Sequence, residues 1–200
     1  MSIAGDQLDG LKELLTIGAG RAASLLNELT GLHISLDVPH AHVCASDSGG
    51  TIFGGGNQGQ LAVVTMPFHG SFSGSSNLII GKEGATKLVS LISEGDGSSH
   101  EFDETTSGTL TEVGNIVLNG VMGSVGNVLS HHLDYGVPTL VVGTLPELKQ
   151  SMIRDAAAVV IAKVRFSVKG HEIAGEIVLL FDVGSFYGFM SSLEGLSQSS

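Results

Sequence analysis

Thr111-Glu112-Val113-Gly114-Asn115-Ile116-Val117-Leu118-Asn119 is the stretch from which the organisation of this chain follows. Within it a glutamate precedes a short polar residue by three positions, a spacing that places both side chains on one face of a helix. The same spacing occurs near the N-terminus, where Glu13 precedes Thr16. We therefore expect two helices, each presenting a glutamate and a short polar side chain next to each other.

A Val-Pro pair follows each motif at the same distance. Pro39 lies 26 residues after Glu13 (39 − 13), and Pro138 lies 26 residues after Glu112 (138 − 112). Motif and proline thus both recur at an offset of 99 residues (112 − 13 and 138 − 39). We interpret the 200-residue chain as a duplication within a single domain, 1–200, in which repeat 1 covers about 6–93, a linker about 94–106 and repeat 2 about 107–196.

The composition indicates a folded protein that does not bind polyanions. Hydrophobic residues make up 42% of the chain, which is enough for a sizeable core. The net charge is −11 and no block of Lys or Arg occurs, so nucleic acid and anionic membrane surfaces are expected to be repelled. The single cysteine, Cys44, excludes an internal disulfide framework. With no targeting segment and no long apolar run, we expect a cytoplasmic protein without membrane insertion.

Hydrophobic periodicity predicts the order helix, strand, strand, strand, helix in each repeat, an α/β (α+β) fold in which two long helices carry the motifs. The first long helix is expected at 6–30, and its apolar stripe comprises Leu8, Leu11, Leu15, Ala19, Ala22, Leu25 and Leu29. The second is expected at 104–132, short helices at 81–93 and 184–196, and strands at 33–45, 60–68, 71–80, 137–143, 157–169 and 172–181. Residues 47–59 are predicted to be a loop, and 144–154 a connection without a helix.

Two details of these elements carry further expectations. Pro39 restricts its strand to a sheet edge or a bend, because proline has no N–H for a ladder hydrogen bond. The second long helix contains Gly114, Gly120, Gly123 and Gly126, each of which costs about 1 kcal/mol relative to alanine. Close packing, or close approach by a partner, is expected to offset that cost.

Three other motifs give weaker indications of a functional site. Residues 18–23 match a GxGxxA dinucleotide fingerprint, but the glycines fall inside a predicted helix, where their N–H groups are already used. His40, His42 and Cys44 alternate along a strand and span about 13 Å, too far for all three to converge on one metal ion without a bend. The neighbouring pair His40 and His42 could share one ion, but no further ligand is identifiable, so a half-buried strand is favoured. Phe72 occupies the serine position of a GxSxG-like segment, so no nucleophile is predicted there.

The paired motif resembles the signature of the CheC/CheX/FliY chemotaxis phosphatases: Asp or Ser, three residues, Glu, two residues, Asn, twenty-two residues, Pro. The second copy supplies Glu112, Asn115 and Pro138 at the correct spacing, with Gly108 where Asp or Ser is expected and Ser107 one position away.

The first copy departs from the signature at a different position. It supplies Asp9, Glu13 and Pro39, but Thr16 stands where asparagine is expected. The resemblance extends over nearly the whole chain, because CheC-like proteins have this length and internal duplication.

The resemblance implies a CheC-like fold, with the two long motif-bearing helices exposed on a sheet. It also implies a phosphatase that accelerates hydrolysis of the aspartyl phosphate on a CheY-like response regulator. By this analogy Asn115 orients the attacking water and Glu112 docks the regulator's active-site lysine. Glu13 and Thr16 then form a degenerate second site, weak or silent in catalysis. No cofactor is expected on the chain itself, since Mg²⁺ is held by the regulator. The resemblance also makes the receptor deamidase CheD a candidate second partner.

Two alternatives remain open at this stage. A FliM-like or CheD-binding adaptor would bind a response regulator without catalysis, because FliM shares the fold and lacks the Glu/Asn pair. An intracellular ligand-binding domain using the glycine-rich segment 49–59 is the other.

Overall fold

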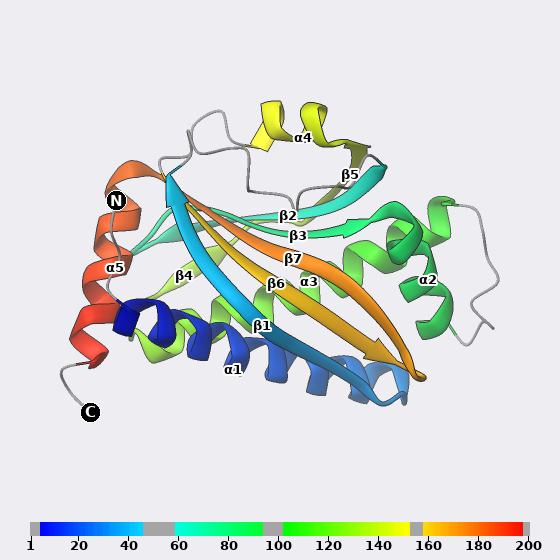
Figure 1. Ribbon diagram of the computed structural model, residues 1–200, viewed down its shortest axis with the longest axis horizontal. Helices are drawn as coiled ribbons and strands as arrows, with labels where there is room; N and C mark the ends of the chain where they lie inside the picture. Colours follow the sequence, from blue (N-terminus) through cyan, green and yellow to red (C-terminus); the bar gives the residue numbers. More distant parts are fainter. Residues whose placement is uncertain (1–4, 46–58, 94–101, 153–157, 198–200) are drawn as a thin grey trace.

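The computed structural model describes residues 5–45, 59–93, 102–152 and 158–197, which form one twisted sheet covered by helices (Figure 1). The strands are β1 (Ile34–Ala45), β2 (Gln60–Gly70), β3 (Gly74–Gly81), β4 (Leu133–Tyr135), β5 (Thr139–Thr144), β6 (Ala158–Val168) and β7 (His171–Phe181). The helices are α1 (Gly5–Thr30), α2 (Lys82–Ile92), α3 (Glu104–Val128), α4 (Leu145–Met152) and α5 (Val183–Ser197). This confirms the expected fold class.

The sheet is antiparallel, in the order β1-β6-β7-β3-β2-β4, and β5 pairs with β2 beside β4. β1 forms one edge, and its pairing with β6 shifts register between Asp37 and His40, around Pro39. The other edge is interrupted between β4 and β5, where Pro138 lies. Each Val-Pro pair therefore breaks an edge strand, as expected of a residue without a ladder donor.

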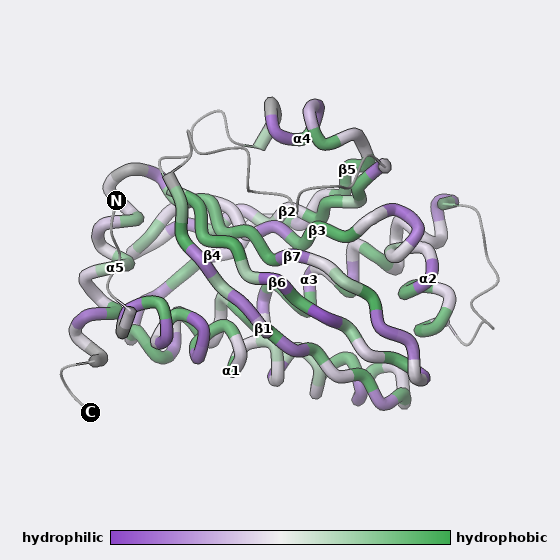
Figure 2. Tube along the Cα trace, viewed as in Figure 1, coloured by the Kyte–Doolittle hydropathy of each residue, from purple (hydrophilic) through white to green (hydrophobic). Residues whose placement is uncertain are grey.

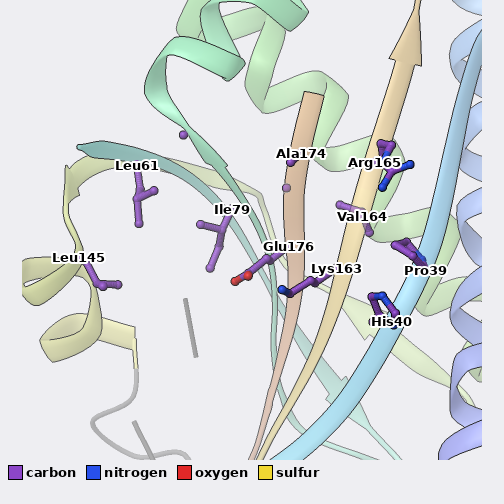
Figure 3. A pocket seen from close by; sticks show the side chains of 12 residues that line it. Pro39, His40, Leu61, Ile79, Leu145, Lys163, Val164, Arg165, Ala174 and Glu176 are labelled. Carbon is purple, nitrogen blue, oxygen red and sulfur yellow. The ribbon is translucent and has the colours of Figure 1, made fainter. Parts of the chain in front are cut away.

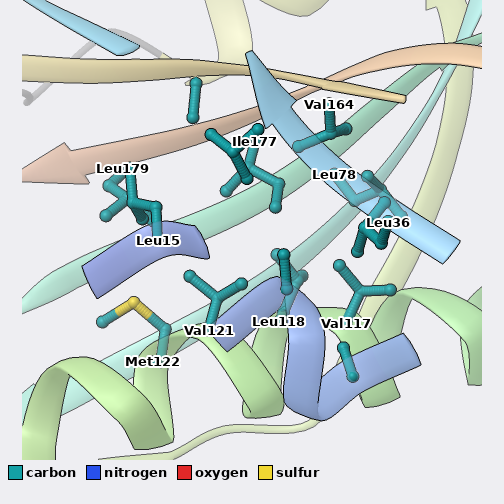
Figure 4. Packing of buried hydrophobic residues seen from close by; sticks show 14 of the residues in the cluster. Leu15, Leu36, Leu78, Val117, Leu118, Val121, Met122, Val164, Ile177 and Leu179 are labelled. Atoms are coloured by element: carbon teal, nitrogen blue, oxygen red, sulfur yellow. The ribbon is translucent and has the colours of Figure 1, made fainter. Parts of the chain in front are cut away.

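The long helices α1 and α3 lie side by side on one face of the sheet and bury its main core (Figures 1 and 4). The tube in Figure 2 shows hydrophobic residues concentrated along the central strands. In Figure 4, Val117, Leu118 and Val121 of α3 point towards Leu78 and Ile177 of the sheet. α4 covers part of the opposite face through a smaller cluster that includes Leu148.

Two glycine contacts set how closely the motif helices pack. A Cβ on Gly18 would lie 2.5 Å from the Cα of Val121, and one on Gly120 would lie 2.9 Å from the Cβ of Ala22. α1 and α3 therefore touch through backbone, which larger side chains would prevent. A Cβ on Gly114 would lie 2.6 Å from Val64 of β2, so α3 also rests directly on the sheet. Close packing accounts for these glycines of α3.

The structure corrects several details of the sequence prediction. Leu25 and Leu29 are 46% and 68% exposed, while Ala23 and Leu26 are buried instead. From Ala22 the buried stripe of α1 continues by a four-residue step to Leu26. A three-residue step leads instead to Leu25, whose side chain is rotated away from the sheet.

Further corrections concern repeat 2. β4 was not predicted, and α4 replaces the expected non-helical connection. α3 ends at Val128 rather than at 132. The second half therefore adds a strand and a helix to the predicted element order, and the division into two repeats stays a prediction. The predicted loop at 47–59 and most of the linker at 94–106 lie outside the described residues.

Within the described ranges, no helix is long and apolar enough to cross a membrane.

Candidate functional site on the outer flank of α3

Helix α3 begins at a defined cap. The Asp103 carboxylate accepts a hydrogen bond from the Thr106 backbone N–H at 2.7 Å, which satisfies one of the free donors of the first turn. This bond holds the pKa of Asp103 below its usual value. Val113 and Val117 are buried and fix the rotation of the helix over the sheet.

The rotation of α3 decides where the predicted site residues point. Gly114 faces Val64 of the sheet. At about 100° per residue, Glu112 lies roughly 160° around the helix from Gly114, and Asn115 about 100° from it. Glu112 is accordingly exposed and Asn115 half-buried. Asn115 is also turned about 140° from Gly120, which faces α1, so the motif occupies the flank of α3 away from α1.

The carboxamide of Asn115 is held by a second carboxamide one turn later. Asn119 Nδ2 donates to the Asn115 backbone oxygen at 2.9 Å and to Asn115 Oδ1 at 2.7 Å. A backbone carbonyl can only accept, so the Asn119 group that approaches it must be the N–H₂. Its second hydrogen then requires an oxygen on Asn115, which sets the orientation of both amides. Among the described residues no other group bonds to the Asn115 side chain, so its own N–H₂ and one lone pair on Oδ1 are available there for an incoming partner.

The corresponding positions on α1 lack this arrangement. Glu13 is exposed like Glu112, but the Thr16 hydroxyl donates to the Lys12 backbone oxygen of its own helix at 2.8 Å. The residue one turn after Thr16 is Gly20, which has no side chain to orient anything. The first motif therefore presents a carboxylate without an adjacent amide.

The structure does not bring the two motifs together. Gly18 faces α3, and Thr16 lies about 160° around α1 from it, on the flank away from α3. Because Asn115 lies on the flank of α3 away from α1, the two motifs open on opposite sides of the helix pair. Each must act alone on whatever it binds.

The remaining signature positions are placed as follows. Asp9 and Gly108 are both exposed. The Ser107 hydroxyl, one position from the expected Asp or Ser, donates to the Asp103 backbone oxygen at 2.9 Å. The Ser107 hydroxyl therefore stabilises the first turn of α3 and is not presented beside Glu112 and Asn115.

The histidine and cysteine positions weighed as metal ligands lie on β1. The described residues contain no group of three or more His, Cys, Asp or Glu that could hold an ion. His40 is exposed, and His42 and Cys44 are half-buried. Cys44 packs against the smaller hydrophobic cluster, on the face of the sheet that α4 covers. Burial and the nearby Lys163 charge lower the pKa of His42, and burial raises the pKa of the Cys44 thiol.

No family model matches the chain, but comparison with known proteins finds similar sequences and similar folds. The chain is 28% identical to the CheY-P phosphatase CheC of Bacillus subtilis over 68% of its own length and 66% of that protein. FliY of Thermotoga maritima has the same fold, with a TM-score of 0.80 at 17% identity over 98% of this chain and 99% of that one. The chain therefore resembles CheC in sequence and shares the fold of FliY.

Other proteins with a similar fold carry different names. CheX from a CheX-CheY-BeF₃-Mg²⁺ complex of Borrelia burgdorferi matches with a TM-score of 0.53 at 18% identity, over 85% of this chain and 97% of that one. FliM from a FliM-SpeE complex of H. pylori matches with a TM-score of 0.69 at 11% identity, over 97% of each. The match spans just under two thirds of the length of the B. subtilis CheC.

Asn119 ends the stretch 111–119 quoted from the sequence, but no role was predicted for it. Carboxamides four residues apart on a helix are known to interact, so the Asn115/Asn119 spacing was an available signal.

Proposed function

We propose that this CheC-like chain is a phosphatase that accelerates dephosphorylation of a phosphorylated CheY-like response regulator, with its competent site on α3. The observation that supports this most is the pair formed by an exposed carboxylate, Glu112, and an oriented carboxamide, Asn115, on a surface beside the packed core. The similarity to the CheY-P phosphatase CheC, and to CheX from a complex with CheY, also supports a phosphatase that acts on a CheY-like regulator.

Hydrolysis of an aspartyl phosphate requires few catalytic groups from the phosphatase. An aspartyl phosphate is an acyl phosphate, already activated towards water, and the regulator itself holds Mg²⁺ under this proposal. Water attacks phosphorus, the bond from phosphorus to the aspartyl oxygen breaks, the carboxylate leaves with that electron pair, and the water proton passes to the phosphate released. Catalysis then consists of holding one water in line with the bond that breaks.

Asn115 suits this task because its amide can donate and accept at once. The free lone pair on Oδ1 accepts a hydrogen from the water, while Nδ2 donates to a neighbouring oxygen. Asn119 removes the freedom of that amide to rotate, which lowers the entropy cost of reaching the reactive arrangement. Glu112 pairs with a cationic side chain of the regulator and sets the register of docking.

A decay assay tests the proposal. A CheY-like regulator from the same genome is phosphorylated with a small-molecule phosphodonor, the donor is removed, and phosphate release is followed with the chain present in substoichiometric amount. A phosphatase shortens the lifetime of the phosphoryl group and turns over many times. Unchanged lifetimes with every regulator of the genome reject the proposal.

A non-catalytic adaptor is the second candidate, and the FliM likeness and the lone competent motif favour it. An adaptor would bind the phosphorylated regulator and leave its phosphate lifetime unchanged or lengthen it. The same assay, run beside a pull-down of the regulator, separates the two. CheD stays a proposed additional partner, and a pull-down of CheD tests it independently.

A further inference from the structure

A hollow lies on the face of the sheet opposite α1 and α3, remote from the phosphatase site. It encloses about 310 Å³ and is bounded by β1, β6, β7, β3, β2 and the start of α4 (Figure 3). That volume is at the small end of the usual range for ligand sites, about 300–1,000 Å³. It therefore suits a small molecule rather than a nucleotide or a long chain.

Small residues in two neighbouring strands create the hollow. Arg165 of β6 pairs with Ala174 of β7, and Gly81 of β3 pairs with Leu61 of β2. Ala174 contributes only a methyl group to this face and Gly81 no side chain. The space between Arg165 and Leu61 is therefore left open.

The two sides of the hollow differ in chemistry. Leu61 and Ile79, each 4% exposed, and Leu145 of α4 form an apolar wall. On the other side Lys163 pairs across the strands with Glu176, and Figure 3 shows their head groups lying next to each other and extending towards that wall. A charged donor and a charged acceptor thus stand beside an apolar surface.

This arrangement selects for a ligand with both charges. A simple anion would meet the Glu176 carboxylate, and a simple cation would meet Lys163 with Arg165 close by. A zwitterion satisfies both, because the ammonium of Lys163 has three donors and the carboxylate of Glu176 has two oxygens, enough for each to serve a neighbour and a ligand. Polyphosphates are disfavoured by the same carboxylate.

We propose that this hollow, defined by Leu61, Ile79, Leu145, Lys163, Ala174 and Glu176, binds a free α-amino acid with an apolar side chain. The ligand carboxylate bonds to Lys163, its ammonium to Glu176, and its side chain covers Leu61, Ile79 and Leu145. Arg165 stands at the rim, where it forms a 3.8 Å ion pair with Glu172. This site is independent of the phosphatase proposal, because it uses the other face of the sheet.

A titration of the isotope-labelled full chain with three matched probes tests the site. Leucine carries both charges, 4-methylpentanoate lacks the ammonium, and 3-methylbutylamine lacks the carboxylate. We expect leucine to shift amide resonances of residues 61, 79 and 174–176, and each analogue to bind about tenfold more weakly, as for the loss of one charge-assisted hydrogen bond.

Variants make the test specific. Lys163→Gln and Glu176→Gln should each weaken leucine binding about tenfold. Ala174→Phe, which fills the hollow, should abolish it. Lys169→Gln removes the same charge just beyond β6 and serves as the control that keeps wild-type affinity. Tighter binding of 4-methylpentanoate than of leucine, binding unaffected by Lys163→Gln, or no shifts at millimolar leucine would each overturn the proposal.

Discussion

The two motif helices differ in the side chains that stand beside their exposed glutamates. α3 carries Asn115 and, one turn later, Asn119, whose amide holds the first in place. At the matching positions α1 carries Thr16, whose hydroxyl is bonded to its own helix backbone, and Gly20. Both helices keep an exposed glutamate. Under the proposed function, α3 can both dock a regulator and position a water, whereas α1 can only dock it.

The largest effect is expected from Asn115→Ala. Loss of the amide removes the group that holds the attacking water, so dephosphorylation should slow by about 100-fold, as for other losses of positioning. Regulator decay under multiple turnover measures it. Asn127→Ala, an exposed asparagine of the same helix, is the matched control and should keep full activity. Full activity in Asn115→Ala would remove α3 as the catalytic helix.

Next in size is Asn119→Ala, which leaves Asn115 present but free to rotate. We expect kcat to fall about tenfold, the worth of one hydrogen bond, with KM nearly unchanged because Glu112 still docks the regulator. Asn119→Asp should behave similarly, since a carboxylate cannot donate to Asn115 Oδ1. If the double variant Asn115→Ala/Asn119→Ala is much slower than Asn115→Ala alone, Asn119 acts directly and not through Asn115.

Glu112→Gln should have the opposite signature. Exposed ion pairs are worth about 0.2–1 kcal/mol, so KM should rise about threefold with kcat little changed. The variant should also lose most of the salt dependence of KM. A fall in kcat alone would assign Glu112 to the chemical step instead of docking.

A graft onto α1 sharpens the comparison further. In an Asn115→Ala background, Thr16→Asn with Gly20→Asn rebuilds the amide pair beside Glu13, and a Cβ at Gly20 meets nothing within 4 Å. We expect the double graft to dephosphorylate the regulator about twofold faster than the regulator's intrinsic decay. Thr16→Asn alone should give a smaller increase, because nothing at position 20 then holds the new carboxamide in place. No gain from the double graft would mean that the α1 flank does not accept a regulator.

The smallest effect concerns the start of α3. Asp103→Ala removes the cap bond to Thr106, so the urea midpoint at pH 7 should fall slightly. Because the pKa of Asp103 is lowered in the folded chain, this stabilisation is present above the unfolded pKa and is lost as pH falls through the lowered value. The wild-type and variant midpoints should therefore converge at acidic pH. A constant difference would place the cause elsewhere.

Much of the fold follows from periodicity. β6 alternates buried Val164 and Phe166 with exposed Lys163 and Arg165, so both its type and its inward face were predictable. β4 was not, because a strand of three residues forms only through pairing with β2, a contact that lies far away in sequence. α4 was missed because its eight residues include Pro146 and hold to the sheet mainly through Leu148.

For the candidate site, the sequence indicates residue types and their spacing, and the catalytic roles stay a prediction. The glutamate-asparagine spacing put Glu112 and Asn115 on one helical face, but which way that face turns depends on Gly114 resting against Val64 of another element. The hold of Asn119 on Asn115 depends on side-chain rotamers, which spacing alone does not specify. The hollow between Arg165 and Leu61 depends on strand order, because it combines residues from strands that are distant in sequence.

The prolines at the two borders of the sheet have a consequence for how these molecules behave at high concentration. An uninterrupted row of free backbone N–H and C=O groups is a template on which strands of other molecules add, leading to fibres. Pro39 in β1 and Pro138 between β4 and β5 remove a donor from the middle of each row. Replacing either with valine should therefore raise the tendency to self-associate, even where the substitution leaves the folded monomer as stable as before.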